Sequence, residues 1–128
     1  MRQAGFALLE AVVALAVLGA VSVAALAAFG AQLRTSERAA TALTAEALTD
    51  DRLARARLLD REDLAHLPDS LAAGRFDAPW DRFSWRIGSR EVLDHPDVFE
   101  VTVAVRWEGG TYDLGTRLYR PRSQGVGR

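Results

Sequence analysis

The feature that most constrains this chain is a long apolar run near its N-terminus that carries a single charge. Between Glu10 and Arg34 there is no ionisable side chain, and residues 11–31 are Ala, Val, Leu, Gly and Phe with one Ser. About 21 such residues form a helix roughly 31 Å long, which matches the hydrocarbon thickness of a bilayer. The sequence therefore predicts one membrane-spanning helix.

Two other interpretations of this run fit it less well. A core helix of a soluble protein is apolar on one side, whereas this run is apolar on every side. A cleaved secretory signal has an apolar region of about 7–15 residues that ends at a small-residue cleavage site. The run is too long and the segment before it too slight for such a signal, so the membrane span is preferred to both.

The amino-acid composition argues against several classes of function for this chain. The 128 residues include no Cys, which excludes disulfides, thiolate metal sites and cysteine nucleophiles. A net charge of −1 provides no basic surface for nucleic acid. His66 and His95 lie far apart in the sequence without a convincing nucleophile, and no glycine-rich phosphate loop occurs. We therefore expect a protein that is not an enzyme, with no cofactor, no metal site and no nucleic-acid partner.

The helical pattern continues beyond the apolar run. No Pro occurs before Pro68, so we expect one helix from about Phe6 to His66, with an amphipathic part over residues 32–67 and any bend at Gly30. Apolar residues spaced three, four and seven apart predict the stripe that faces the rest of the fold: Ala40, Leu43, Ala47, Ala54 and Leu58, flanked by Leu48, Leu53 and Leu59.

The remaining residues have the pattern of a small sheet. Residues 68–82 are rich in turn formers and predict a connecting loop, residues 83–120 predict antiparallel strands, and residues 121–128 predict a loose tail. Apolar and polar residues alternate in FSWRI and VFEVTVAVRW, as in strands with one buried face. The chain is thus predicted to be an α+β protein in which a long N-terminal helix packs on a small antiparallel sheet.

Specific sheet residues are also assigned. Residues 109–110, Gly-Gly, are predicted to form a two-residue hairpin turn, because both can take φ > 0. That turn places Trp107 opposite Tyr112, and the next pairs are Val105 with Leu114, Val103 with Thr116, and Val101 with Leu118. The three Trp residues, Trp80, Trp85 and Trp107, are expected in the core or the sheet rather than on a ligand platform, and Asp94 and Asp97 in a solvated turn.

The junction GFALLE, at Gly5, Phe6 and Glu10, resembles the class III signal of type IV pilin-like proteins. That signal has a short leader ending in Gly, then Phe, a Glu at the fifth mature position and an apolar helix. The chain is most similar to minor pseudopilin I of type II secretion. The similarity rests on GFALLE, on Ala45-Glu46 in the helix, on the Trp-containing strand FSWRI and on the final hairpin with VTVAVRW.

The resemblance implies a processing pathway and a set of partners. A prepilin peptidase would remove the leader, residues 1–5, after Gly5 and N-methylate Phe6. Glu10 would then pair with the terminal amine of a neighbouring subunit during assembly. The expected partners are this peptidase, other pseudopilins in a hetero-oligomeric filament or tip complex, the inner-membrane assembly platform and membrane lipid. The expected location is the inner membrane, crossed once by residues 6–31, with the C-terminal part in the periplasm.

Small residues in the span leave room for close approach of another helix, which favours association in lipid. Those assigned to helix packing are Ala14, Gly19, Ala20 and Ala24.

Two other functions stay open on the sequence alone. One is a minor pilin of a type IV pilus or a DNA-uptake pilus. The other is a non-assembling single-span anchor that displays a periplasmic module.

Overall fold

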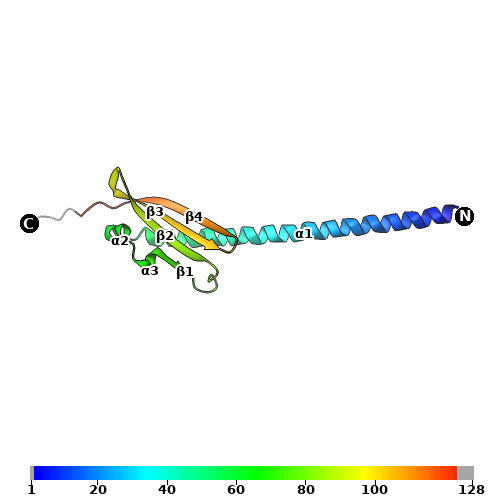
Figure 1. The fold of residues 1–128 in the computed structure, drawn as a ribbon, viewed down its shortest axis with the longest axis horizontal. Helices are drawn as coiled ribbons and strands as arrows, with labels where there is room; N and C mark the ends of the chain where they lie inside the picture. Colours follow the sequence, from blue (N-terminus) through cyan, green and yellow to red (C-terminus); the bar gives the residue numbers. More distant parts are fainter. Residues whose placement is uncertain (1, 124–128) are drawn as a thin grey trace, which may run out of the picture. The chain divides into compact units, whose positions relative to one another are not determined.

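The computed structural model describes residues 2–123 (Figure 1). The first element is helix α1, Arg2–Ala56, and the chain divides into two compact units, one ending at Ala40 and the other beginning at Thr41. α1 contributes residues to both units. Met1 of the predicted leader and residues 124–128 of the predicted tail lie outside the described residues.

The first unit is a helix whose side chains have no protein around them. α1 continues through Gly30 without interruption, and large apolar side chains such as Leu15 and Phe29 are exposed. Alanine and leucine, the best helix formers, dominate this stretch. Within residues 2–123, α1 is the one helix long and apolar enough to cross a membrane by length and composition.

The second unit combines the last turns of α1 with two short helices and a sheet. The helices are α2, Arg61–Ala65, and α3, Asp69–Ala72. The strands are β1, Ala73–Arg75; β2, Ser84–Val92; β3, His95–Trp107; and β4, Gly110–Tyr119. All neighbouring strands are antiparallel, and their spatial order β1-β2-β3-β4 is the order in the chain. The predicted α+β fold, a long N-terminal helix packed on a small antiparallel sheet as in pilins, is confirmed.

The core of the second unit lies between one face of the sheet and the final turns of α1. Alternate residues of β2 and β3 point into it, which gives the predicted strands one buried face. The buried side chains from the sheet side are Phe76, Phe83, Trp85, Ile87, Phe99, Val101, Val103, Val105 and Leu118, and those from α1 are Ala45, Thr49, Leu53 and Ala56. Trp107 is half-buried against this core, whereas Trp80 lies in the loop before β2 and is exposed.

The predicted centre of the helix's contact stripe is wrong, whereas its predicted flank is confirmed. Leu43 is 66% exposed and Leu58 86% exposed, whereas Ala45, Thr49 and Ala56 are buried. Of the flanking leucines, Leu53 is buried, and Leu48 and Leu59 are partly buried against the core. At 3.6 residues per turn the buried set lies about 180° around the helix from the predicted centre. The small side chains of the buried set allow the helix backbone to approach the large sheet residues closely. The buried Thr49 hydroxyl donates to the Ala45 carbonyl at 2.7 Å, so it is not left unpaired.

The predicted end of the helix at His66 is also wrong. After Ala56 the hydrogen bonds tighten to three-residue spacing, with the Leu58 and Leu59 N–H groups donating to Arg55 and Ala56 carbonyls. Asp60 then caps a new helix, since its side chain accepts from the Asp63 N–H at 2.9 Å. A capping residue thus divides the helix where no proline is present. The segment predicted as a loop, 68–82, contains α3 and β1.

The hairpin between β3 and β4 has a different register from the prediction. The turn is Glu108-Gly109, Trp107 pairs with Gly110, and each later pair is shifted by two residues, for example Val105 with Tyr112. Only Gly109 has a positive φ, 110°, among residues 2–123. A Cβ on Gly110 would lie 2.5 Å from the Trp107 ring. The second glycine therefore gives the Trp ring room, and the two-residue shift leaves every side chain on its predicted face.

The contact between Gly74 and Trp85 generates a stability prediction. A Cβ on Gly74 would lie 2.6 Å from Cζ2 of Trp85, whose ring is buried with the Arg52 guanidinium 4.2 Å from its centroid. Gly74→Ala should therefore lower the free energy of unfolding by about 1–3 kcal/mol. In Gly88→Ala the new Cβ meets no atom within 4 Å, and the change should stay within about 0.5 kcal/mol. Denaturant unfolding followed by Trp fluorescence measures both, and equal stabilities would contradict the predicted clash.

Candidate functional site

The first candidate site is the N-terminal stretch of α1. Gly5, Phe6 and Glu10 all lie in the helix with exposed side chains, Phe6 being 74% exposed. Phe6 and Glu10 are four residues apart, so they share a helix face. A Cβ placed on Gly5 would meet no atom within 4 Å. The Phe6 and Glu10 side chains are therefore exposed on one face of the helix.

The small residues assigned to helix packing are exposed as well. Ala20 and Ala24 are four residues apart and share one face, while Gly19 lies about 100° around the helix from Ala20. Ala14 is exposed about one and two-thirds turns before Ala20, which places it about 120° around the helix from Ala20, and Gly19 has open space beside it. These residues therefore lie on several sides of the helix rather than on one face.

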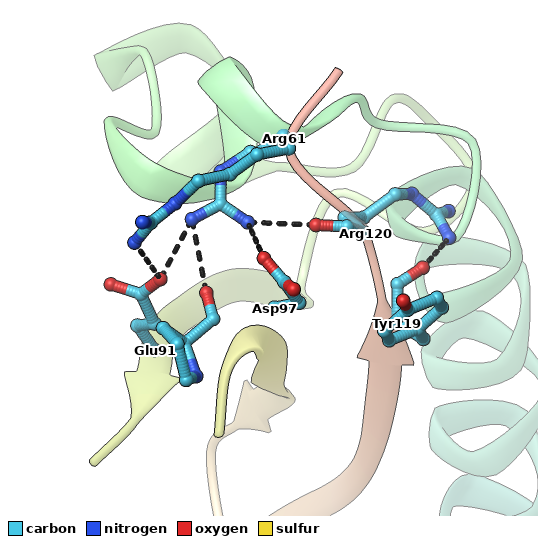
Figure 2. Close-up of polar contacts among 7 residues, drawn as sticks. Arg61, Glu91, Asp97, Tyr119 and Arg120 are labelled. Atoms are coloured by element: carbon cyan, nitrogen blue, oxygen red, sulfur yellow. Dashed lines mark hydrogen bonds and ion pairs between the residues drawn. The ribbon is translucent and has the colours of Figure 1, made fainter. Parts of the chain in front are cut away.

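The second candidate site is formed by two arginines, Arg61 and Arg120, which we call the arginine clamp (Figure 2). Arg61 projects from the start of α2 towards the end of the sheet where β2 finishes and β3 begins. Its guanidinium donates to Glu91 at 2.8 Å, to Asp97 at 3.1 Å and to the Arg120 carbonyl at 2.7 Å. A further hydrogen bond, 3.0 Å long, reaches the carbonyl of Pro96.

The surroundings of Arg61 favour a fixed guanidinium. The side chain is 26% exposed, and its charged end lies 5.2 Å from the centre of the Phe99 ring. Arginine presents several N–H donors in a planar array, so one residue can hold two carboxylates and two carbonyls at once. A half-buried guanidinium with four partners joins three chain segments that are far apart in the sequence.

The second arginine of the clamp binds the end of α1. Arg120 donates from Nε to the Leu59 carbonyl at 3.1 Å and from Nη2 to the Arg57 carbonyl. Carbonyls at a helix C-terminus lack intrahelical partners, and a cationic donor there is favourable. The backbone N–H of Arg120 donates to the Asp97 carbonyl at 2.7 Å. The clamp therefore fastens the end of α1, the β2–β3 region and the segment after β4 together.

The clamp was not among the sites predicted from the sequence. All 16 basic residues are arginines, so neither Arg61 nor Arg120 is distinguished by type, and apart from the adjacent Tyr119 carbonyl their side-chain partners lie 30 to 63 positions away. Of the acids placed in a solvated turn, Asp94 is in the exposed turn, whereas Asp97 is in β3 and binds Arg61. His66 and His95 are both exposed, at the end of α2 and the start of β3.

The clamp generates a second stability prediction. Arg61→Ala removes the Arg61 donor from two carboxylates and two carbonyls, and a hydrogen bond to a charged group contributes about 1.5–3 kcal/mol. The loss is not the sum of four such bonds, because Glu91 and Asp97 are 42% and 37% exposed to water and Glu91 keeps Arg122 at 4.0 Å. We expect the free energy of unfolding to fall by about 2–3 kcal/mol. The control Arg55→Ala removes an exposed pair with Asp51 and should cost about 0.5 kcal/mol or less. Urea titration compares the two, and similar losses would contradict the role of the clamp.

Comparison with known proteins bears on the first site. Residues 1–26 match the family model described as the prokaryotic N-terminal methylation motif. This match confirms the type IV pilin-like class III signal predicted from GFALLE. No curated protein and no solved structure matches the chain.

Proposed function

We propose that this chain is a structural subunit of the type II secretion pseudopilus, a minor pseudopilin at or near its tip. The observation that carries the proposal is the match of residues 1–26 to the methylation motif, which overlaps the start of a helix long and apolar enough to cross a membrane. This role is structural rather than enzymatic. It places the C-terminal part in the periplasm and the subunit in the inner membrane until it is assembled.

Processing in this proposal acts at Gly5 and Phe6. A prepilin peptidase cleaves after Gly5 and methylates the new terminus at Phe6. In α1 both residues are helical, and a peptidase must open the first turn to reach the peptide bond. Glycine is about 1 kcal/mol less favourable than alanine inside a helix, so Gly5 lowers the cost of that opening.

Glu10 acts in assembly. A carboxylate at the middle of a bilayer costs about 2.5–3.5 kcal/mol, and the cost falls towards the interface. Glu10 is one helical turn from Phe6, so its charge lies close to the end that cleavage creates. The new terminal amine of a neighbouring subunit is the counter-ion, which aligns the two helices as they leave the membrane.

The faces with Ala20, Ala24 and Gly19 allow close helix contact, and the exposed Leu43 and Leu58 provide apolar area for neighbouring subunits.

The processing step predicts a defined N-terminus. Mass spectrometry of the protein from its native membrane should find a chain that begins at N-methylated Phe6. Gly5→Val should block cleavage, since it adds a branched side chain at the scissile position. Gly19→Val, at an equally open position of the same helix, should be cleaved normally. An intact Met1 on the wild-type protein would contradict the proposal.

The assembly step predicts that Glu10→Val is cleaved yet fails to enter the filament, because the amine of its neighbour then has no counter-ion. Glu37→Val, which removes an exposed acid beyond the span, is the control and should assemble normally. Secretion of a substrate and the subunit content of sheared filaments measure the effect. Normal secretion with Glu10→Val would exclude the pairing role and favour a non-assembling anchor.

Genes for a secretin and several pseudopilins beside the gene for this chain would favour a role in secretion over a role in a type IV or DNA-uptake pilus.

A further inference from the structure

Strand β4 forms one edge of the sheet (Figure 1). Within residues 2–123 only β3 pairs with it, and that pairing runs along the whole strand from Gly110 to Tyr119. β4 is ten residues long and contains no Pro, a residue with which proteins often protect an edge from further pairing. An edge of this kind carries a row of unpaired backbone N–H and C=O groups, which is the template that an additional strand needs.

The hydrogen bonds to β3 decide which residues make up that row. The Arg120 N–H donates to the Asp97 carbonyl at 2.7 Å, and in an antiparallel pair the residues that bond across the ladder alternate with residues that do not. Every second residue before Arg120 therefore directs its backbone groups to β3, and the residues between them direct theirs away from the sheet. We call these outward residues, all of them exposed, the free edge: Thr111, Asp113, Gly115, Arg117 and Tyr119.

The core-side face of β4 is only partly covered. Leu118 is buried, but Tyr112, Leu114 and Thr116 are partly exposed, although they lie on the same face of the strand. Tyr112 and Leu114 pack against the core from its rim. A strand added at the free edge would place every second side chain on this face and extend the cover over the two rim residues. The free edge therefore favours a partner strand with apolar residues at alternate positions.

The outer face of the free edge adds two opposite charges. Asp113 lies opposite Ala104, which has no charge to offer. Arg117 lies opposite Glu100, whose carboxylate is held by Arg90 at 2.7 Å. In the part of the chain that the structure describes, neither Asp113 nor Arg117 has an ion pair. Opposite charges that face each other across two strands are stabilising, so the free edge favours a partner with a basic residue beside Asp113 and an acidic one beside Arg117.

We propose that the free edge binds an extended strand of a different pilin-like subunit, which adds a fifth strand beside β4. A strand is the occupant because a row of alternating backbone donors and acceptors is matched by another peptide backbone, while its side chains give specificity. The inference rests on the proposed function in naming the partner as another subunit of the same assembly.

A second copy of this chain is a poorer occupant than a different subunit. Its other edge strand, β1, has three residues and cannot pair along ten. Antiparallel pairing of β4 with β4 would bring Asp113 beside Arg117, but it would also turn the helix packed on one sheet opposite to the helix packed on the other. Two subunits whose spans cross one membrane in the same direction cannot meet in that way.

Photo-cross-linking of the full-length protein in its native cells tests the pairing. Tyr119, which is 63% exposed, is replaced by p-benzoylphenylalanine, so that a photo-reactive aromatic group lies on the free edge. The control places the same group at Trp80, an exposed aromatic residue in the loop before β2. The Tyr119 position should give an adduct with a protein that has its own N-terminal methylation motif, mapped by mass spectrometry to a strand with alternate apolar residues. An equal yield of this adduct from Trp80 overturns the proposal.

A proline in the free edge tests whether backbone hydrogen bonds hold the partner. Gly115→Pro removes one outward N–H and leaves the bonds to β3 in place. Gly115→Ala is the matched control, because it keeps the N–H and its Cβ lies 3.7 Å from the nearest atoms. The Tyr119 adduct should fall about ten-fold in the proline variant and stay unchanged in the alanine variant. Equal urea midpoints of the two variants show that the fold is kept, and equal adduct yields then overturn the proposal.

Charge reversal provides a second variant in which every backbone group is kept. Arg117→Glu should lower the adduct yield about five-fold, whereas Arg117→Lys retains the charge and should retain the yield. Equal yields from these two variants would show that the partner has no acid beside Arg117 and would overturn the stated chemistry of the strand. An adduct of the chain with a second copy of itself, in place of a different subunit, overturns the choice of partner.

The result is separable from a failure of the proposed function. The absence of any Tyr119 adduct, together with N-methylated Phe6 in the same membrane, rejects the strand pairing and leaves the proposed function standing. An intact Met1 rejects the proposed function whatever the yield of the adduct.

Discussion

The apolar face of the sheet depends on a short part of one helix for its cover. The turns of α1 after Thr41 belong to the same compact unit as the sheet, and their buried residues share its core. Those turns place Ala45, Thr49 and Ala56 against residues as large as Phe83 and Phe99, and the size difference is what allows a single helix to fit closely over three strands. Without that contact the strands would have one apolar face in water and would lose the hydrophobic stabilisation that burial of this face provides.

Two arginines make connections in the second unit of the kind that disulfides make in many small domains. The described chain has no cysteine to join the end of α1 to the sheet. Arg61 and Arg120 make that junction through carboxylates and backbone carbonyls instead. The same contacts stop α1 near Ala56 and hold the β2–β3 turn. The junction between the end of α1, the β2–β3 region and the segment after β4 therefore depends on these two side chains.

The elements with strong local signals were predictable. The apolar run, the GFALLE junction and the alternating strands FSWRI and VFEVTVAVRW are patterns within one segment, and each has the predicted character. The contact stripe was not predictable, because alanines such as Ala40, Ala42, Ala45 and Ala47 lie on several sides of the helix and give the periodic signal no single direction. The clamp was not predictable either, since it joins residues from separate segments that share no local pattern.

The sequence by itself determined that α1 has a membrane-compatible half, that residues 1–26 carry the N-terminal methylation motif, and that the second half of the chain forms antiparallel strands. These properties depend on the order of residues along a single segment. Only the tertiary structure decided which side of α1 is buried, where that helix stops and which residues pair across the last hairpin. Each of those depends on shape and hydrogen-bond partners outside the local pattern. The surface of the sheet decides which helix face is buried, and Arg120 and the Asp60 cap decide where the helix ends. The Trp107 ring, which lies over Gly110, decides the register of the hairpin.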